Sequence, residues 1–409
     1  RIDQDLDNEE YRFEVTDRVQ ISGGSYAGVA VGTVTFLQAL ITKEHGLELP
    51  VMTISDSPSA SYRGLLIDVA RHFHPPQMLK QIIDMCRWYK IRYLHLHLTD
   101  DQSFTFPSQA YPKLATPGRH YTIEQLRELE RYAVERGVVI VPELEMPGHA
   151  GTMVRRMPEV FATQRGERNV MNYISPKVCQ ALDTIIGEMM DIFRATPYFH
   201  IGGDEVNFSG LDRDPDFQSA MKKTGLKSVE ELYRKFIVDR NETVRQLGKQ
   251  MVVWEGFRPG GKVEIPRNIL VMVFETSYYR PDHLVQEGYT VINTSWQPLY
   301  VVAQRPAPVG QWPVKHIYNW NMYRWEHFQK KRPAYNPIQL SSDASVIGAQ
   351  ICSWENPPEK VIPLVQKRLP AMNEQIWNPQ VGHDFEDFSQ RLQVTACRLE
   401  KLFNGKQNS

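Results

Sequence analysis

The sequence predicts an α/β protein, a (β/α)8 TIM barrel preceded by the C-terminal part of a small α+β domain. From Tyr62 onward, short apolar runs of strand length alternate with amphipathic helical segments. Eight strand–helix alternations are the pattern of a closed parallel barrel. Polar and aromatic residues gather where the predicted strands end, and the first 55 residues follow a different pattern.

The N-terminal segment is predicted to form the small α+β unit. Tyr11–Ile21 alternates like a strand, Ser22–Ser25 has the composition of a turn, and Gly28–Ile41 has the apolar spacing of a helix. A segment of this length is too short to hold a large core alone. We therefore expect a partial small α+β domain over residues 1–55 and the (β/α)8 barrel, which carries the predicted site described below, over residues 56–409.

The predicted barrel elements are short apolar strands joined by amphipathic helices. The strands are expected over Leu65–Val69, Tyr93–Leu98, Val138–Glu143, Tyr198–Ile201, Met251–Trp254, Ile269–Phe274, Tyr289–Thr294 and Val346–Ser353. The helices are expected over Pro75–Tyr89, Thr122–Arg136, Pro176–Arg194, Ser228–Leu247, Pro281–Glu287 and Pro358–Trp377. No internal repeat interrupts this order.

The composition narrows the classes of partner. Lys and Arg total 47 against 48 for Asp and Glu, so no charge imbalance indicates nucleic acid or an anionic membrane. No apolar run is long enough to cross a bilayer. The four cysteines are widely spread, without metal-ligand spacing, and a disulfide framework is not expected. These features do not predict the oligomeric state.

The stretch from His200 to Glu205 is the centre of the predicted site. It follows a buried strand, and Gly202 and Gly203 precede the adjacent carboxylates of Asp204 and Glu205. Neighbours on a regular strand point to opposite faces, so the chain must leave extended geometry for both carboxylates to face one pocket. Close like charges raise one pKa. A protonated acid beside an ionised one suits glycosidic bond cleavage.

Other strand ends add polar and aromatic side chains, since active sites of such barrels lie at the carboxyl ends of the strands. The polar ones are Asp68, Arg71, His95, His97, Asp100, Asp101, Glu143, Glu145, Glu255, Glu275 and Glu355. Trp254, Phe274 and Trp354 occupy matching positions and together favour a wall for the apolar face of a sugar. His149 lies in a Pro-Gly-His-Ala-Gly loop, where it is placed to relay between Glu205 and an aspartate.

A metal site is a rival interpretation of the histidines. Alternation along a strand puts His95 and His97 on one face, as metal sites require. With His149 and Asp204 they would form a metal-hydrolase centre. Satisfied core histidines are more common, and the surrounding polar residues suit a sugar better.

Four motifs resemble the β-N-acetylhexosaminidases, family 20 of the glycoside hydrolases. They are Arg63–Asp68 (RGLLID), His95–Asp101 (HLHLTDD), Pro142–His149 (PELEMPGH) and His200–Glu205 (HIGGDE), in the order found in the family. The resemblance covers most of residues 62–380. It implies retaining hydrolysis in which the 2-acetamido oxygen of the substrate, rather than an enzyme nucleophile, attacks the anomeric carbon.

The resemblance also implies roles for particular residues. Glu205 matches the general acid/base, and Asp204 matches the residue that orients the acetamide and stabilises its charge. Asp100 and His149 match the pair that supports the acid. Arg63 matches the residue that binds ring hydroxyls, while Trp254 and Trp354 match walls of the sugar pocket.

Three positions depart from the family pattern. Phe274 stands where Trp is usual, Pro298 stands at the position of the Tyr that bonds the acetamide carbonyl, and Asn356 replaces a hydroxyl-binding Glu. Either a neighbour such as Trp296, Tyr300 or Asn321 compensates, or the sugar preference has changed. Phe274, Tyr300 and Asn356 are counted among the expected sugar-binding residues.

The predicted function is therefore an exo-acting β-N-acetylhexosaminidase that removes terminal GlcNAc or GalNAc from glycans. It needs no cofactor and no metal, and the resemblance implies a secreted, periplasmic or lysosomal location. The alternative from another class is a barrel that binds amino sugars without hydrolysing them. Intact Asp204 and Glu205 argue against it, whereas the changes at positions 298 and 356 argue for it.

Overall fold

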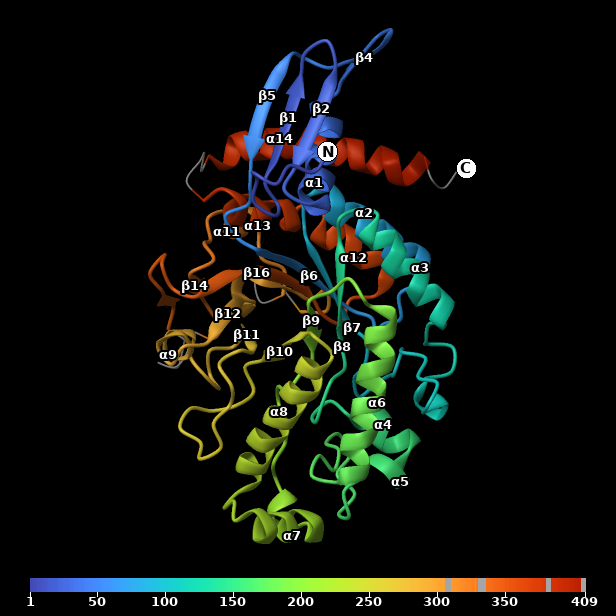
Figure 1. Ribbon diagram of the computed structural model, residues 1–409, viewed down its shortest axis with the longest axis vertical. Coiled ribbons are helices and arrows are strands. Elements are labelled where there is room, and N and C mark those ends of the chain that lie inside the picture. Colours follow the sequence, from blue (N-terminus) through green and yellow to red (C-terminus); the bar gives the residue numbers. More distant parts are fainter. Residues whose placement is uncertain (306–309, 328, 330–335, 380–383, 406–409) are drawn as a thin grey trace.

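A closed barrel of parallel strands forms the body of the computed structural model, which describes residues 1–405 except 306–309, 328, 330–335 and 380–383 (Figure 1). The barrel strands are β6 (Tyr62–Asp68), β7 (Tyr93–His97), β8 (Val139–Glu143), β9 (Tyr198–His200), β10 (Gln250–Trp254), β11 (Leu270–Val273), β12 (Thr290–Asn293) and β16 (Val346–Ser353). Each pairs in parallel with the next, and the pairing of β12 with β16 closes the ring. The predicted TIM barrel is confirmed.

Helices surround the barrel, and their buried faces carry the apolar residues of the main core. The principal helices are α2 (Pro76–Trp88), α3 (Ile123–Val134), α6 (Pro176–Ile192), α8 (Val229–Gln246), α9 (Pro281–Gln286), α12 (Pro358–Val365) and α13 (Arg368–Trp377). Thr122 caps α3, because its side chain accepts from Gln125 N while the Gln125 side chain accepts from Thr122 N. No helix within these described ranges is long and apolar enough to cross a bilayer.

A three-stranded antiparallel sheet lies at one end of the molecule, beyond the amino ends of the barrel strands (Figure 1). It contains β1 (Tyr11–Val15), β2 (Val19–Gly23) and β5 (Met52–Asp56), with α1 (Tyr26–Ala39) packed against it. The single strand expected over Tyr11–Ile21 is therefore wrong. The chain reverses between Val15 and Val19, so that two shorter strands pair with each other.

Further elements lie outside the predicted pattern. They are β3 (Ile41–Lys43), β4 (Gly46–Glu48), α4 (Gly151–Arg156), α5 (Pro158–Phe161), α7 (Pro215–Thr224), α10 (Trp296–Leu299), β13 (Tyr300–Val301), α11 (Val314–Tyr318), β14 (Arg324–Trp325), β15 (Ile338–Gln339) and α14 (Phe385–Gly405). In Figure 1, α14 crosses between the small sheet and the barrel. The division of the chain at residues 55 and 56 stays a prediction.

Candidate active site

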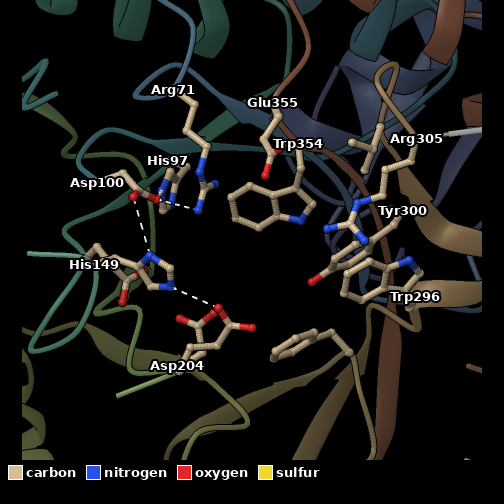
Figure 2. Close-up of a pocket in the computed structure, with 14 residues that line it drawn as sticks. Arg71, His97, Asp100, His149, Asp204, Trp296, Tyr300, Arg305, Trp354 and Glu355 are labelled. Atoms are coloured by element: carbon tan, nitrogen blue, oxygen red, sulfur yellow. Dashed lines mark hydrogen bonds and ion pairs between the residues drawn. The ribbon is translucent and has the colours of Figure 1, made fainter. Parts of the chain in front are cut away.

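A pocket of about 610 Å³, including its open mouth, lies at the carboxyl ends of the barrel strands (Figure 2). Its lining residues follow β6, β7, β8, β9, β11, β12 and β16 along the chain. They are Arg71, His97, Asp100, Glu145, His149, Asp204, Glu205, Phe274, Trp296, Tyr300, Val302, Arg305, Trp354 and Glu355. The mixture of aromatic and charged groups is typical of a small-molecule binding pocket.

The backbone after β9 brings Asp204 and Glu205 to this pocket together. Gly202 and Gly203 have φ values of 68° and 97°, and Glu205 has a φ of 47°. A Cβ on Gly202 would lie 2.0 Å from Oε1 of Glu145, so only glycine fits there. The predicted departure from extended geometry is confirmed. A left-handed glutamate is costly, and such conformations concentrate at functional sites.

His149 connects Glu205 to Asp100. Its Nε2 lies 3.4 Å from Oε2 of Glu205, and its Nδ1 lies 3.5 Å from Oδ1 of Asp100. Burial alone would lower the pKa of His149, but the hydrogen bonds to Asp100 and Glu205 and the charge of Asp204 raise it to about 12. The hydrogen bond from His149 lowers the pKa of Glu205. In the free pocket, the proton of this pair therefore resides on His149.

Asp204 lies in a different environment from its neighbour. Burial raises the pKa of Asp204 to about 6, and the charge of Glu205 adds to this effect although His149 opposes it. Oδ1 of Asp204 is buried and has no hydrogen-bond partner among the described residues. A buried acceptor of this kind is ready for a donor supplied by a ligand.

Aromatic rings form the wall opposite the histidines. Figure 2 shows Trp296, Tyr300 and Trp354 facing His149 and Asp204 across the pocket. The Tyr300 ring stacks on Trp296 with centroids 4.8 Å apart and lies parallel to Phe274 at 6.1 Å. Trp354 is 6.1 Å from Tyr300. Phe274, Tyr300 and Trp354 thus lie in the pocket as expected, and Trp296 extends their wall.

Arg63 is not in the pocket, and its expected role in sugar binding is wrong. It stands near the amino end of β6, whereas the pocket lies at the carboxyl end. Its guanidinium is fully buried, pairs with Glu9 at 2.5 Å, donates to the carbonyl oxygen of Ala60 at 2.8 Å and lies over the Trp377 ring. Arg63 therefore joins the small sheet's segment to the bottom of the barrel.

Arg71 is the arginine that reaches the pocket from this part of the chain. It follows the carboxyl end of β6, donates to Asp68 at 3.1 Å and pairs with Asp100 at 2.8 Å. Its guanidinium also lies over the Trp354 ring. The position of each arginine relative to the end of the strand, rather than its motif, distinguishes Arg71 from Arg63.

Two other expected binding residues lie beneath the pocket surface. Trp254 is 1% exposed, donates from Nε1 to Glu143 at 2.6 Å and supports the Trp354 ring from 5.8 Å. Asn356 is also 1% exposed and donates to the carbonyl oxygen of Val301 at 2.7 Å. It joins β13 to the end of β16 and does not face a sugar, so both assignments are corrected.

The departures at positions 298 and 356, which had favoured a non-catalytic barrel, are compensated by neighbouring residues that line the pocket. Glu355 has a φ of 55°, and its side chain lines the pocket in place of Asn356. Tyr300 lines it where Pro298 had suggested a missing tyrosine. Asn321 is exposed in a turn, where its side chain accepts from Tyr323 N, outside the lining residues.

The proposed metal centre is not assembled as the rival interpretation required. His95 and His97 do point to one side, but both meet the carboxylate of Glu143 there. Both ring nitrogens of His97 face carboxylates, at 2.5 Å from Glu143 and 2.8 Å from Asp100. These imidazoles act as partners of carboxylates, while His149 lies in the pocket above them.

Comparison with known proteins finds glycosyl hydrolase family 20 and beta-hexosaminidases among the matches to this chain. The family model for the catalytic domain of glycosyl hydrolase family 20 matches residues 61–380. A beta-hexosaminidase of Vibrio furnissii is 27% identical over 91% of the chain, and one of Akkermansia muciniphila is 30% identical over 98%. The chain spans 66% of the length of the first of these relatives and 85% of the second.

The fold agrees with solved structures as well. The exo β-N-acetylglucosaminidase of Vibrio harveyi, solved in complex with N-acetylglucosamine, superposes with a TM-score of 0.82 and 25% identity. The match covers 99% of this chain and 68% of that one. A chitobiase of Flavobacterium johnsoniae gives a TM-score of 0.80 at 27% identity, covering 96% of this chain and 60% of that one.

Proposed function

Because the chain belongs to glycosyl hydrolase family 20, we propose that it is an exo-acting β-N-acetylhexosaminidase that removes terminal GlcNAc or GalNAc from glycans. The observation that carries this proposal is the arrangement around Glu205. This carboxylate is backed by His149 and Asp100 and stands beside a second carboxylate, Asp204, in a pocket with aromatic walls.

Glu205 is the proposed general acid and base. In the free pocket its pKa is lowered by His149. A bound sugar displaces water from Glu205, which disfavours the ionised carboxylate and moves the proton from His149 Nε2 to Glu205. Glu205 then protonates the leaving glycosidic oxygen, and afterwards it deprotonates the incoming water.

Asp204 and Tyr300 are proposed to hold the 2-acetamido group of the substrate. The free Oδ1 of Asp204 accepts the acetamide N–H, and the Tyr300 hydroxyl, which faces the pocket in Figure 2, donates to the acetamide carbonyl. The carbonyl oxygen attacks the anomeric carbon as the glycosidic bond breaks, which gives an oxazolinium ion. Ionised Asp204 stabilises the positive charge that develops.

The remaining polar groups are proposed to bind the hydroxyls. Arg71 and Glu355 lie on one side of Trp354, and Arg305 lies on its other side, so together they border the part of the pocket opposite Asp204 (Figure 2). The Trp354 ring provides an apolar surface for the sugar ring between them.

The test compares wild type with Glu205→Gln on two N-acetylglucosaminides. Turnover of N,N′-diacetylchitobiose, which needs a protonated leaving group, should fall ~10²–10⁴-fold. Turnover of a dinitrophenyl glycoside should fall much less, because its leaving group needs little protonation. Near-wild-type turnover of chitobiose by Glu205→Gln would contradict the assignment. No turnover of either substrate by wild type would favour a sugar-binding barrel.

The nucleophile is tested through the substrate. A glucoside with a 2-hydroxyl lacks the acetamide and should be nearly inert, and a thiazoline analogue of the oxazolinium ion should inhibit wild type. Equal cleavage of the glucoside and the N-acetyl substrate would refute substrate assistance. The same outcome would require a second enzyme carboxylate as nucleophile.

A further inference from the structure

A buried hydrogen-bonded cluster continues from the active site into the barrel interior. Behind His149, Oδ2 of Asp100 lies 2.8 Å from Nε2 of His97, and Nδ1 of His97 lies 2.5 Å from Oε2 of Glu143. Asp100, His97 and Glu143 are each no more than 2% exposed. Glu205 and His149 in the pocket thus stand at one end of a five-residue series that ends at Glu143.

His97 must carry a proton on each nitrogen to donate to two carboxylates at once. The charges along the series then alternate from Glu143 to Glu205, with His97 and His149 positive. Burial would lower the pKa of His97, but Glu143 and Asp100 raise it to about 10. Hydrogen bonds from His149 and His97 and the charge of Arg71 lower the pKa of Asp100 despite its burial.

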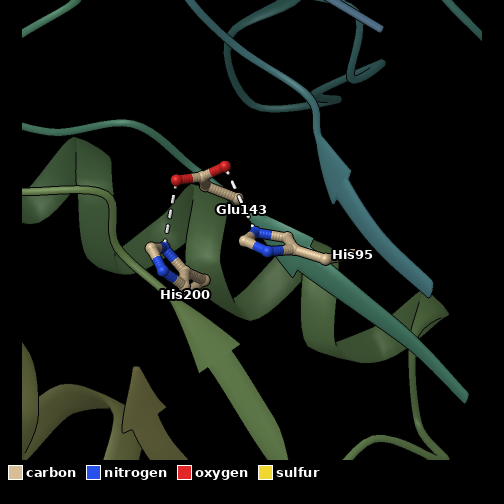
Figure 3. A group of neighbouring side chains, drawn as sticks. All are labelled: His95, Glu143 and His200. Atoms are coloured by element: carbon tan, nitrogen blue, oxygen red, sulfur yellow. Dashed lines mark ion pairs between the residues drawn. The ribbon is translucent and has the colours of Figure 1, made fainter. Parts of the chain in front are cut away.

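Other titratable and aromatic side chains surround the His97 pairs with Glu143 and Asp100. His95 and His200 approach the same Glu143 carboxylate, at 3.2 Å and 3.0 Å (Figure 3). Glu145 also lies near His97, and burial together with the charges of Asp204 and Glu143 raises its pKa well above the ordinary value, which disfavours its ionised form. Arg71 pairs with the same Asp100 oxygen as His97, and the rings of Trp354 and His97 meet in a T-shaped contact with centroids 4.9 Å apart.

We propose that His97 and Glu143 are positioning residues for the general acid. The inference rests on the proposed hydrolase function. Glu143 keeps His97 cationic, and His97 keeps Asp100 ionised and oriented as an acceptor. Asp100 then fixes the proton on Nδ1 of His149, which leaves Nε2 directed at Glu205. The Glu143–His97 pair therefore sets the pH at which Glu205 gives up its proton.

Glu143→Gln tests this with little change of shape. The Gln oxygen still accepts from Trp254, and the Gln amide donates to Nδ1 of a neutral His97, so the hydrogen bonds remain while the charge pair disappears. Arg71 still pairs with Asp100, but the second cation beside this carboxylate, His97, is lost. Protonated Glu205 is therefore favoured, and the basic limb of the kcat profile should move up by roughly half a pH unit. Chitobiose turnover should fall ~10-fold, and dinitrophenyl glycoside turnover should change little.

The matched control is His95→Gln, because His95 is equally buried and approaches the same carboxylate without contacting Asp100. His95→Gln should leave unchanged both the pH profile of kcat and the ratio of chitobiose turnover to dinitrophenyl glycoside turnover. His97→Gln should reproduce the effects of Glu143→Gln, and the double variant should be no worse than the single ones.

Three results would overturn the proposal. The first is that Glu143→Gln and His97→Gln keep the wild-type basic limb of the kcat profile and the wild-type ratio of chitobiose turnover to dinitrophenyl glycoside turnover. The second is that His95→Gln changes both quantities as much as they do. The third is that neither Glu143→Gln nor His97→Gln folds, since the cluster then serves only packing. The hydrolase function itself is tested independently of these variants, because its failure would appear as no turnover of the dinitrophenyl glycoside by wild type.

Discussion

Asp204→Asn should make the enzyme less active and its fold more stable. The substitution keeps the size of the side chain but removes the charge proposed to stabilise the oxazolinium ion. Loss of such a preorganised group typically lowers turnover ~10²–10³-fold. Because the defect acts through the acetamide, it should persist with dinitrophenyl glycosides, unlike the defect of Glu205→Gln.

The stability gain follows from the pKa of Asp204, which burial raises to about 6 in the folded protein. An unfolded aspartic acid titrates near about 3.9. Between these values the folded chain holds a proton that the unfolded chain has released, so stability falls as pH rises. The difference amounts to about 3 kcal/mol, present in full below pH ~4 and lost above pH ~6.

Thermal melting of wild type and Asp204→Asn between pH 4 and pH 8 measures this effect. Asparagine does not ionise, so the Tm advantage of the variant should grow by roughly 3–4 °C across that range for a chain of 409 residues. Asp191→Asn, at a side chain that is 77% exposed, is the control and should show no such trend. A Tm difference independent of pH, or one that shrinks as pH rises, would refute the reasoning.

Other predictions concern residues whose roles the structure changed. Glu355→Gln should lower kcat/KM for a nitrophenyl N-acetylglucosaminide ~10-fold, as expected for a lost charge-assisted hydrogen bond, and an unchanged kcat/KM would remove Glu355 from sugar binding. Arg63→Met should destabilise the fold by ~3–5 kcal/mol in urea titrations, since it leaves Glu9 unpaired, without changing KM; a raised KM with normal stability would restore its sugar-binding role. Exhaustive chelation should leave turnover intact because the proposed nucleophile comes from the substrate, and activity restored only by added zinc would count against it.

Local pattern was sufficient to predict the barrel and to place the adjacent carboxylates of Asp204 and Glu205 in its pocket. The apolar runs mark all eight barrel strands, and the rule that sites lie at carboxyl ends brings Asp100, His149, Asp204 and Glu205 together. The glycines before Asp204 carry the turn in the sequence itself. These features depend on residues close together in the chain, which is why they are predictable.

The errors arose where a residue's direction depends on distant parts of the chain. A motif containing Arg63 does not show which end of β6 faces the pocket. Trp254 ends a strand, yet its ring lies one layer down because Trp354 covers it. The left-handed backbone at Glu355 exchanges the directions of neighbouring side chains, so Asn356 turns inward. Such a backbone conformation depends on packing that no local pattern records.

The pairing of Arg63 with Glu9 makes the barrel dependent on the segment that precedes it. An arginine inside a barrel end is tolerable only while a carboxylate from outside the barrel neutralises it. The small sheet is therefore more than an appended module, because its chain supplies the counter-ion for a charge buried in the catalytic unit. Loss of the Glu9 carboxylate would thus leave a buried, unpaired charge in the barrel, although neither Glu9 nor Arg63 lines the substrate pocket.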